Sequence, residues 1–246
     1  MEEGSSQFRT PFAFRRTRTA TGSGYRHSYR SRGGFGGYVR RRYIQNIPRL
    51  VKRPKRGYKK LQLFDEGLRD VTFDNQGCSR LLNGINLGNK RYDRQSDKIV
   101  VKGIKLIGNV QLGQSAIEEA GVHHVILFII SDNNPSDSIP TPDKIFNGVG
   151  EGNPETWIVD PDESDRFRML KKMKFKLVGG NDRNHARHGI EVVDRFVILD
   201  VWTDYKDELI GNVGNIQKGA IYLVAASVSG KECKYTLRSQ MYFKTV

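Results

Sequence analysis

Positive charge is confined to one end of this 246-residue chain, which limits where a folded core can form. Residues 1–60 hold 17 Lys and Arg against two acidic residues, a net charge of +15, whereas residues 61–246 hold 24 against 25, a net charge of −1. Between Gly4 and Lys60 there is no acidic residue, and residues 22–43 consist mostly of Gly, Arg, Ser and Tyr. Such a segment buries too little apolar surface to offset the entropy of ordering it. We therefore expect a disordered basic arm over 1–60 and a folded domain over 61–246.

The folded part has the pattern of an antiparallel β protein. Runs rich in Val, Ile, Phe and Tyr alternate with clusters of Gly, Asn, Pro and Ser. The pattern predicts strands at 61–64, 68–73, 98–112, 122–131, 156–159, 165–178, 190–201, 220–228 and 233–246. One short helix is predicted at 141–147. Long helical segments between strands are missing, so we expect an all-β sandwich or jelly roll rather than a parallel α/β sheet.

The arm interleaves basic and aromatic residues. Lys and Arg neutralise phosphates and release counterions, and aromatic faces stack on unpaired bases without reading their sequence. This combination favours a flexible single-stranded nucleic acid over a rigid duplex; the alternative is a solvated tail that only aids solubility. The predicted phosphate contacts are Arg15, Arg16, Arg18, Arg26, Arg30, Arg32, Arg40, Arg41, Arg42, Lys52, Arg53, Lys55, Arg56, Lys59 and Lys60. The predicted base-stacking residues are Tyr25, Tyr29, Phe35, Tyr38, Tyr43 and Tyr58.

Two basic clusters in the arm are typical of a nuclear-localisation signal. An import receptor offers acidic pockets to an extended basic peptide of this kind. The clusters consist of Arg40, Arg41, Arg42, Lys52, Arg53, Pro54, Lys55 and Arg56. Alternatively they supply further phosphate contacts, and the two roles can share residues at different times.

The segment 166–177 alternates basic and apolar residues with the period of a strand. Its apolar face is predicted to be core and consists of Phe167, Met169, Met173, Phe175 and Leu177. Its basic face consists of Arg166, Arg168, Lys172, Lys174 and Lys176. This basic face either contacts nucleic acid or is a solvated outer face.

Catalytic and metal-binding patterns have little support. His185 and His188 with Asp182 have a loosely metal-like spacing, but they fall in a polar stretch with no cysteine nearby, so no metal is expected. The sequence has no phosphate-binding loop and no Ser or Cys nucleophile motif. We therefore expect that the protein is not an enzyme and binds no cofactor. Cys78 and Cys233 are expected to be reduced core residues. The longest apolar run, 122–130, is too short to span a membrane; it contains His123 and His124, one of which should point inward.

Several segments resemble the coat proteins of geminiviruses, plant viruses with small circular single-stranded DNA genomes. They are Pro-Thr-Pro-Asp-Lys-Ile-Phe at 140–146, Pro-Glu-Thr-Trp-Ile-Val at 154–159, and Asp-Arg-Phe at 165–167 with the basic strand after it. The others are Val-Gly-Asn-Ile-Gln-Lys-Gly-Ala-Ile-Tyr-Leu-Val at 213–224 and Met-Tyr-Phe-Lys-Thr-Val at 241–246. In order and spacing they cover about residues 95–246, and the arm matches in character.

The resemblance implies a particular particle and life cycle. It implies an eight-stranded jelly roll, pentamers that build twinned icosahedral particles, a packaged single-stranded DNA genome, a host nuclear import receptor and an insect vector receptor. The protein would then be found in the virion and in the host nucleus. The chain lacks the Cys/His cluster proposed as zinc-finger-like in some members, so no metal is expected from the resemblance either. The alternative is a nuclear shuttle or movement protein that binds single-stranded DNA without forming a shell.

Overall fold

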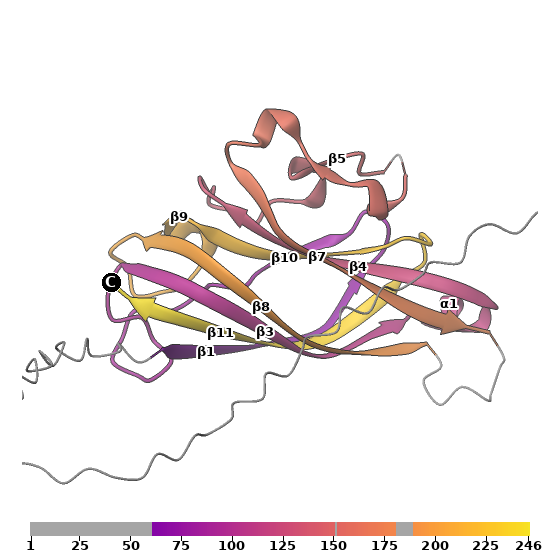
Figure 1. Ribbon diagram of the computed structural model, residues 1–246, viewed down its shortest axis with the longest axis horizontal. Helices are drawn as coiled ribbons and strands as arrows, with labels where there is room; N and C mark the ends of the chain where they lie inside the picture. The colour runs from indigo at the N-terminus through magenta and orange to yellow at the C-terminus, as the bar shows by residue number, and fades with distance from the viewer. Residues whose placement is uncertain (1–60, 151, 181–188) are drawn as a thin grey trace, which may run out of the picture. The chain divides into compact units, whose positions relative to one another are not determined.

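Two antiparallel sheets packed face to face form the core of the protein, which is described by a computed structural model for residues 61–150, 152–180 and 189–246 (Figure 1). The five-stranded sheet has the order β1-β11-β3-β8-β9 and the four-stranded sheet the order β2-β10-β4-β7. The first sheet comprises β1 (Gln62–Phe73), β11 (Cys233–Thr245), β3 (Lys98–Leu112), β8 (Ile190–Tyr205) and β9 (Ile216–Lys218). The second comprises β2 (Cys78–Leu81), β10 (Ala220–Ser227), β4 (Gly121–Asp132) and β7 (Phe167–Gly179).

The strand order is that of a jelly roll. Eight main strands follow one another along the chain as β1, β2, β3, β4, β7, β8, β10 and β11, and the first of them pairs with the last. The chain crosses between the sheets at each step except from β4 to β7, which pair with each other, and the resulting order is that of two interlocked Greek keys. The predicted all-β fold, an antiparallel eight-stranded jelly-roll sandwich, is confirmed.

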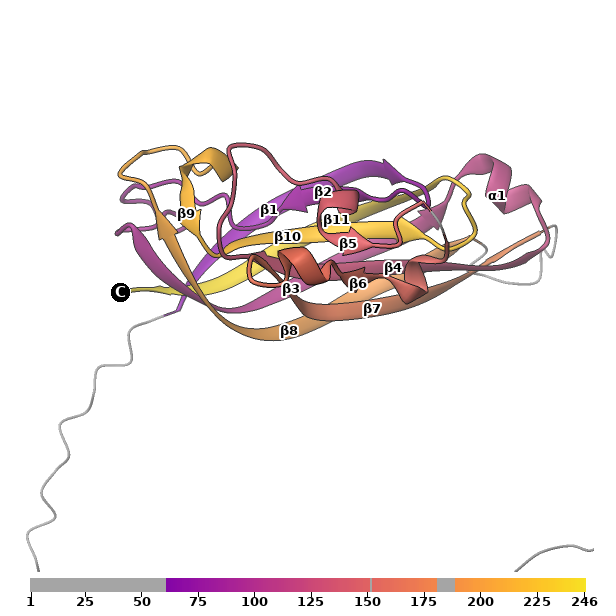
Figure 2. The same cartoon turned by 90° about the horizontal axis from the view of Figure 1, so that it is seen from above.

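The centre of the four-stranded sheet is buried on both faces. Every residue of β10 is buried, and so is the run from Val125 to Ile130 in β4. One face packs against the five-stranded sheet, and the other is covered by residues 133–166, which connect β4 to β7 (Figure 2). Burial on both sides explains why this part of the sequence is a continuous apolar run instead of an alternation.

The connection 133–166, named here the cover segment, builds a small core of its own on the sheet. It contains the two-stranded pair β5 (Phe146–Asn147) and β6 (Ile158–Val159) and three 3-10 turns, at Pro142–Lys144, Pro154–Thr156 and Pro161–Glu163. Its Phe146 and Trp157 rings lie 4.9 and 5.9 Å from the ring of Phe128 on β4. Trp157 is only 2% exposed, so the cover segment is anchored by a buried aromatic cluster.

Several predicted elements need correction. The two strands predicted at 61–64 and 68–73 form one strand, β1, with an irregularity between Leu68 and Val71. There Asp70 has a positive φ of 50° and accepts a hydrogen bond at 3.1 Å from the Thr236 hydroxyl, and the bulge lets the strand continue. The predicted helix at 141–147 is a single 3-10 turn, and the strand predicted at 156–159 begins at Ile158. Sequence reasoning missed the short strands β2, β5 and β9 and the helix α1 (Gln114–Glu118).

The predicted arm, residues 1–60, lies outside the described residues, so its boundary with the domain stays a prediction. Within the described ranges, no helix is long and apolar enough to cross a membrane.

Candidate nucleic-acid interface

The basic strand predicted from the sequence is β7, an edge strand of the four-stranded sheet. The buried positions are as predicted, because Phe167, Met173, Phe175 and Leu177 are buried and Met169 is half-buried. The prediction that all five share one face is wrong, because the pairing of β7 with β4 shifts register by one residue between Ile129 and Ile130. Phe167 and Met169 therefore lie on the face that carries the cover segment, and the other three lie on the face between the sheets. Lys172, Lys174 and Lys176 are exposed on the face that carries the cover segment. Arg168 is exposed as well, but it pairs with Ser131 on the other side of the register shift and lies on the opposite face, beside β8. The local cause is the strand period of two, because one face has to fill the space between the sheets.

Arg166, directly before β7, forms an ion pair within the chain. Its Nε and Nη2 atoms donate to the two carboxylate oxygens of Asp132 at 3.1 and 3.2 Å, and the Asp132 side chain is fully buried. This bidentate pair raises the pKa of Arg166. It ties the end of the cover segment to the end of β4, so Arg166 has a structural partner already.

Lys172 and Lys174 also have partners inside the chain, both at Glu155 of the cover segment. The Lys174 ammonium lies 2.6 Å from the Glu155 carboxylate, and Lys172 donates to the Glu155 carbonyl. His124 lies 3.6 Å from the same carboxylate. The hydrogen bond from Lys174 holds the pKa of Glu155 below its usual value. Glu155 thus neutralises part of the basic face.

Arg168 and Lys176 differ from the other three bases. Both are exposed, and neither forms an ion pair with another residue of the described ranges. The five bases predicted at 166–176 therefore fall into two groups, three with intrachain partners and two that present their charge outward. Contact with nucleic acid stays a prediction for all five.

The remaining predicted site residues lie in the arm, outside the described residues. These are the arm phosphate contacts from Arg15 to Lys60, the six stacking candidates from Tyr25 to Tyr58, and the import clusters at 40–42 and 52–56. Their roles stay predictions.

The histidines and cysteines take the positions expected of packing residues where they are described. His123 is buried and His124 half-exposed, so the expectation that one of the pair points inward is confirmed. Cys78 and Cys233 are free, and burial raises the pKa of both thiols, which disfavours the reactive thiolate. The candidate group Asp182, His185 and His188 lies outside the described residues; elsewhere in the described ranges no cluster of three metal-ligating side chains occurs.

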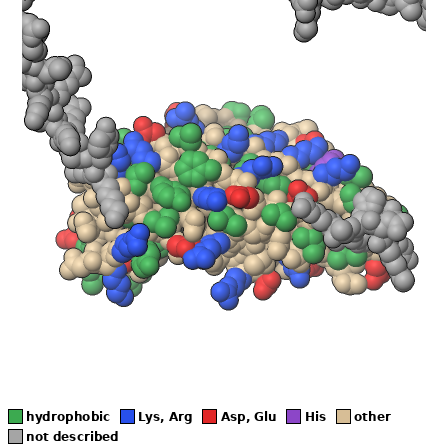
Figure 3. All heavy atoms as spheres, turned by 60° about the horizontal axis from the view of Figure 1, so that its bottom comes forward, with side chains coloured by type: hydrophobic (Ala, Val, Ile, Leu, Met, Phe, Trp, Pro, Cys, Tyr) green, Lys and Arg blue, Asp and Glu red, His purple; other side chains and the backbone are tan. Residues whose placement is uncertain are grey.

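Sequence reasoning missed the outer face of the five-stranded sheet. Here Lys105 on β3 lies 3.4 Å from Asp194 on β8, and Lys102 pairs with Asp200 in the same way. Phe196 is exposed between these two pairs, and Trp202 is exposed between Asp200 and Asp204, which pairs with Lys98. The view of this face shows apolar side chains interspersed with Lys, Arg, Asp and Glu (Figure 3). The sequence did contain a pattern that could have predicted this face. Acidic and large apolar residues are interspersed at the even positions from 192 to 204, which lie opposite the core.

An open groove of about 620 Å³ follows the edge where β7 and β8 lie close together. Met169 and Leu170 of β7 form one side, and Ile198 and Trp202 of β8 form the other. Ile198 is 81% exposed, so this edge groove presents apolar side chains to solvent next to the polar and charged residues that complete its lining.

Fold and surface together define a jelly-roll β-sandwich with an open groove at one edge, in a chain whose excess positive charge lies in residues 1–60 of the sequence. The model of the geminivirus coat protein/nuclear export factor BR1 family matches residues 9–246, and the chain belongs to that family. The resemblance predicted from the sequence is thus confirmed.

Individual relatives are similar over most of their length. The chain is 26% identical over 188 residues to the capsid protein of Tobacco yellow dwarf virus (strain Australia), covering 72% of this chain and 74% of that protein. It is 25% identical over 200 residues to the capsid protein of African cassava mosaic virus (isolate West Kenyan 844), covering 80% and 73%. Among solved structures, polyomavirus VP1 from Trichodysplasia spinulosa-associated polyomavirus has 9% identity and a TM-score of 0.30, covering 76% of this chain and 94% of that one. Desmodium yellow mottle tymovirus has 9% identity and a TM-score of 0.29, covering 76% and 86%. The fold assignment rests on the strand order alone.

Proposed function

We propose that this chain is a coat subunit that packages circular single-stranded DNA and assembles into the shell of a geminivirus particle. The observation that carries the proposal is the division of charge, +15 over residues 1–60 and −1 over residues 61–246, in a member of this family. A nearly neutral sandwich can pack against copies of itself, while the arms neutralise the phosphates between them. The names of the relatives, which are capsid proteins, support the same function.

The mechanism has three steps. The basic clusters at 40–42 and 52–56 engage a host import receptor, which brings the protein to the nucleus. The arm then condenses single-stranded DNA without sequence preference, through Lys and Arg on phosphates and aromatic rings on bases. Neutralised arms no longer repel one another, so sandwiches assemble as pentamers of a twinned particle. This role is structural, and it requires no catalysis, metal or cofactor from the chain.

A matched pair of full-length variants tests the arm. In the arm variant, seven bases become Gln: Arg40, Arg41, Arg42, Lys52, Arg53, Lys55 and Arg56. In the control, seven exposed bases of the sandwich become Gln: Arg69, Arg80, Lys90, Arg91, Lys144, Lys171 and Arg195. Both variants lose the same net charge, so any difference between them reports position and not overall charge.

Salt-dependent binding to single-stranded DNA is the measurement. If about half of the 17 arm bases contact phosphates, the slope of log K against log salt is roughly −6 for the wild-type chain. We expect the arm variant to lose much of that slope, about 0.7 per contact removed, and the control to keep nearly all of it. Equal losses in the two variants would overturn the assignment of DNA binding to the arm.

The second candidate is a shuttle protein that coats single-stranded DNA without closing a shell. The matching family includes nuclear export factors as well as coat proteins, which favours keeping this candidate. Negative-stain electron microscopy of the full-length protein with circular single-stranded DNA separates the two functions. Uniform closed particles, single or twinned, support the coat function, and irregular coated strands support the shuttle.

A further inference from the structure

The loop between β8 and β9 exposes two adjacent apolar side chains. Leu209 is 70% exposed and Ile210 is 64% exposed. Asp207 and Glu208 precede them and are exposed as well, and neither acid forms an ion pair with another described residue. These four residues, named here the loop tip, combine a small apolar surface with two unneutralised negative charges.

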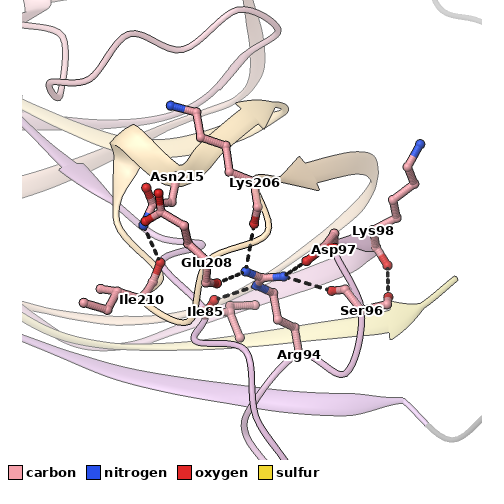
Figure 4. A network of polar contacts seen from close by, with 9 residues as sticks. All are labelled: Ile85, Arg94, Ser96, Asp97, Lys98, Lys206, Glu208, Ile210 and Asn215. Carbon is pink, nitrogen blue, oxygen red and sulfur yellow. Dashed lines mark hydrogen bonds and ion pairs between the residues drawn. The ribbon is translucent and has the colours of Figure 1, made fainter.

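A fully buried arginine fixes the backbone beneath the loop tip. Arg94, 0% exposed, donates from Nη2 to the carbonyls of Lys206 (3.3 Å) and Glu208, as the close-up shows (Figure 4). Its other nitrogens bond the segment 85–97, including the Asp97 carboxylate, and its guanidinium lies 4.3 Å from the centre of the Tyr205 ring. Arg94 thus ties the loop to the segment that leads into β3.

Further hydrogen bonds hold the loop tip itself. The Leu87 amide donates to the Leu209 carbonyl at 2.9 Å, and the Asn215 side chain donates to the Ile210 carbonyl at 3.0 Å. The Gly211 amide donates to the Asn86 side chain at 2.7 Å. A Cβ at Gly211 would lie 2.4 Å from the backbone of residue 85, so the two segments touch directly. With its backbone bonded inward, the loop tip presents its side chains in a fixed geometry, which lowers the entropy cost of docking.

The edge groove has the opposite charge pattern. Arg168 and Lys218 line it beside the apolar side chains, and neither forms an ion pair with another described residue. The groove also contains Asp200, but this carboxylate is already paired with Lys102. A groove with exposed apolar side chains and two available positive charges matches an apolar tip with two available negative charges.

We propose that the loop tip of one copy of this chain docks into the edge groove of a neighbouring copy. Leu209 and Ile210 then contact Ile198 and Trp202, and Asp207 and Glu208 lie against Arg168 and Lys218. The contact joins two different surfaces, so it is heterologous and can close copies into a ring, as a shell requires. This inference rests on the proposed coat function, and names the surfaces through which its subunits meet.

Two full-length variants test the apolar part of the contact. Leu209→Asp with Ile210→Asp places charges in the apolar groove, and we expect at least a tenfold loss of assembled particles with DNA affinity unchanged. The matched control is Ile158→Asp, a side chain 58% exposed on β6, which we expect to assemble like the wild type. Normal assembly of the loop-tip variant would overturn the proposal. Because all three side chains are solvent-exposed, we expect both variants to fold, and circular dichroism checks this.

Charge reversal tests the identity of the partner surface. Asp207→Lys with Glu208→Lys, and separately Arg168→Glu with Lys218→Glu, should each reduce assembly at least tenfold. Combining all four reversals in one chain should restore assembly, because the pairing is again complementary. If the combined chain stays unassembled, the edge groove is not the partner. Restoration also separates this role of Arg168 from DNA contact, which reversal of the loop tip could not rescue.

Failure of the coat function would be recognised separately. Wild-type protein that binds DNA but never closes into particles would overturn that function. Sedimentation of the wild type and the Leu209→Asp/Ile210→Asp variant would still test the contact. Association that depends on these two residues supports it, and identical sedimentation of the two chains overturns it.

Discussion

The outer faces of the two sheets differ in whether the chain itself covers their apolar side chains. On the four-stranded sheet, residues 133–166 bury the face under Phe146 and Trp157, and Glu155 binds the lysines of β7. On the five-stranded sheet, Phe196 and Trp202 stay exposed between ion pairs formed by neighbouring strands. The first face is completed by the chain itself.

The difference shows which surfaces are left for other molecules. A face that holds a fully packed aromatic cluster contributes to the stability of one subunit. A face with large apolar side chains in water contributes little to that stability, and such patches mark interaction sites. Of the two tryptophans in the chain, Trp157 of the cover segment is buried and Trp202 is exposed on the five-stranded sheet, so substituting each of them tests the comparison most directly.

The largest effect is expected from Trp157→Ala. Trp157 is 2% exposed and packs against Phe128 and Phe146, so truncation leaves a cavity between the cover segment and the sheet. We expect a loss of about 3–5 kcal/mol in the free energy of unfolding. Chemical denaturation followed by circular dichroism measures it, and Trp157→Phe, which keeps a ring in place, should lose less. A loss below about 1 kcal/mol would mean that the cover segment contributes no second core.

A smaller loss is expected from Asp132→Asn. The buried Asp132 carboxylate accepts two hydrogen bonds from Arg166 and one at 3.0 Å from the Asn134 amide. An amide of the same shape removes the charge and one acceptor, and we expect a cost of about 2 kcal/mol. The same denaturation measurement applies, with Asp162→Asn, an exposed acid of the cover segment, as the control. Equal stability of the two variants would contradict an anchoring role for the ion pair.

A weaker, pH-dependent contribution is expected from Glu155. Because Lys174 lowers the pKa of Glu155, the pairing stabilises the fold above the usual glutamate pKa of 4.5 and is lost as pH falls through the lower, folded-state pKa. The cover segment should therefore loosen below about pH 4.5, and Glu155→Gln should loosen it already at neutral pH. Fluorescence of Trp157 in a Trp202→Phe chain reports this. If Glu155→Gln leaves the pH profile unchanged, Glu155 does not stabilise the cover segment.

The comparison between the two faces also shows what could be predicted from the sequence. The long strands were predictable because their apolar residues repeat with the strand period, as in the buried Met173, Phe175 and Leu177 of β7. The jelly-roll order followed from the family resemblance, because strand pairing between distant segments such as β1 and β11 leaves no local pattern. β2 has only four residues, Cys78 to Leu81, which is too short a stretch to show an apolar period, and so this strand was missed.

The candidate site was predictable only in part. Alternation in 166–177 correctly placed the bases outside the core, but it could not identify their partners. The Glu155 carbonyl lies 17 residues along the chain from its partner Lys172, and Asp132 lies 34 residues from its partner Arg166. The loop tip was not predicted at all. Its rigidity depends on Arg94, which is 112 residues from Lys206, and a buried arginine looks like any surface base in a sequence.

The smallest effect on stability, and the sharpest use of the comparison, is expected from Trp202→Ala. Trp202 is 55% exposed, so its truncation opens no cavity, and the free energy of unfolding of the subunit should change by no more than about 0.5 kcal/mol. The same residue lines the edge groove, so particle assembly should fall while the subunit stays folded. Trp157→Ala should do the reverse at moderate temperature, lowering stability first and assembly only through loss of folded protein. Denaturation curves and particle counts for both variants therefore decide between the two roles. A Trp202→Ala chain that loses several kcal/mol would show that the five-stranded sheet needs its outer face for its own stability, and the distinction between the two faces would fail.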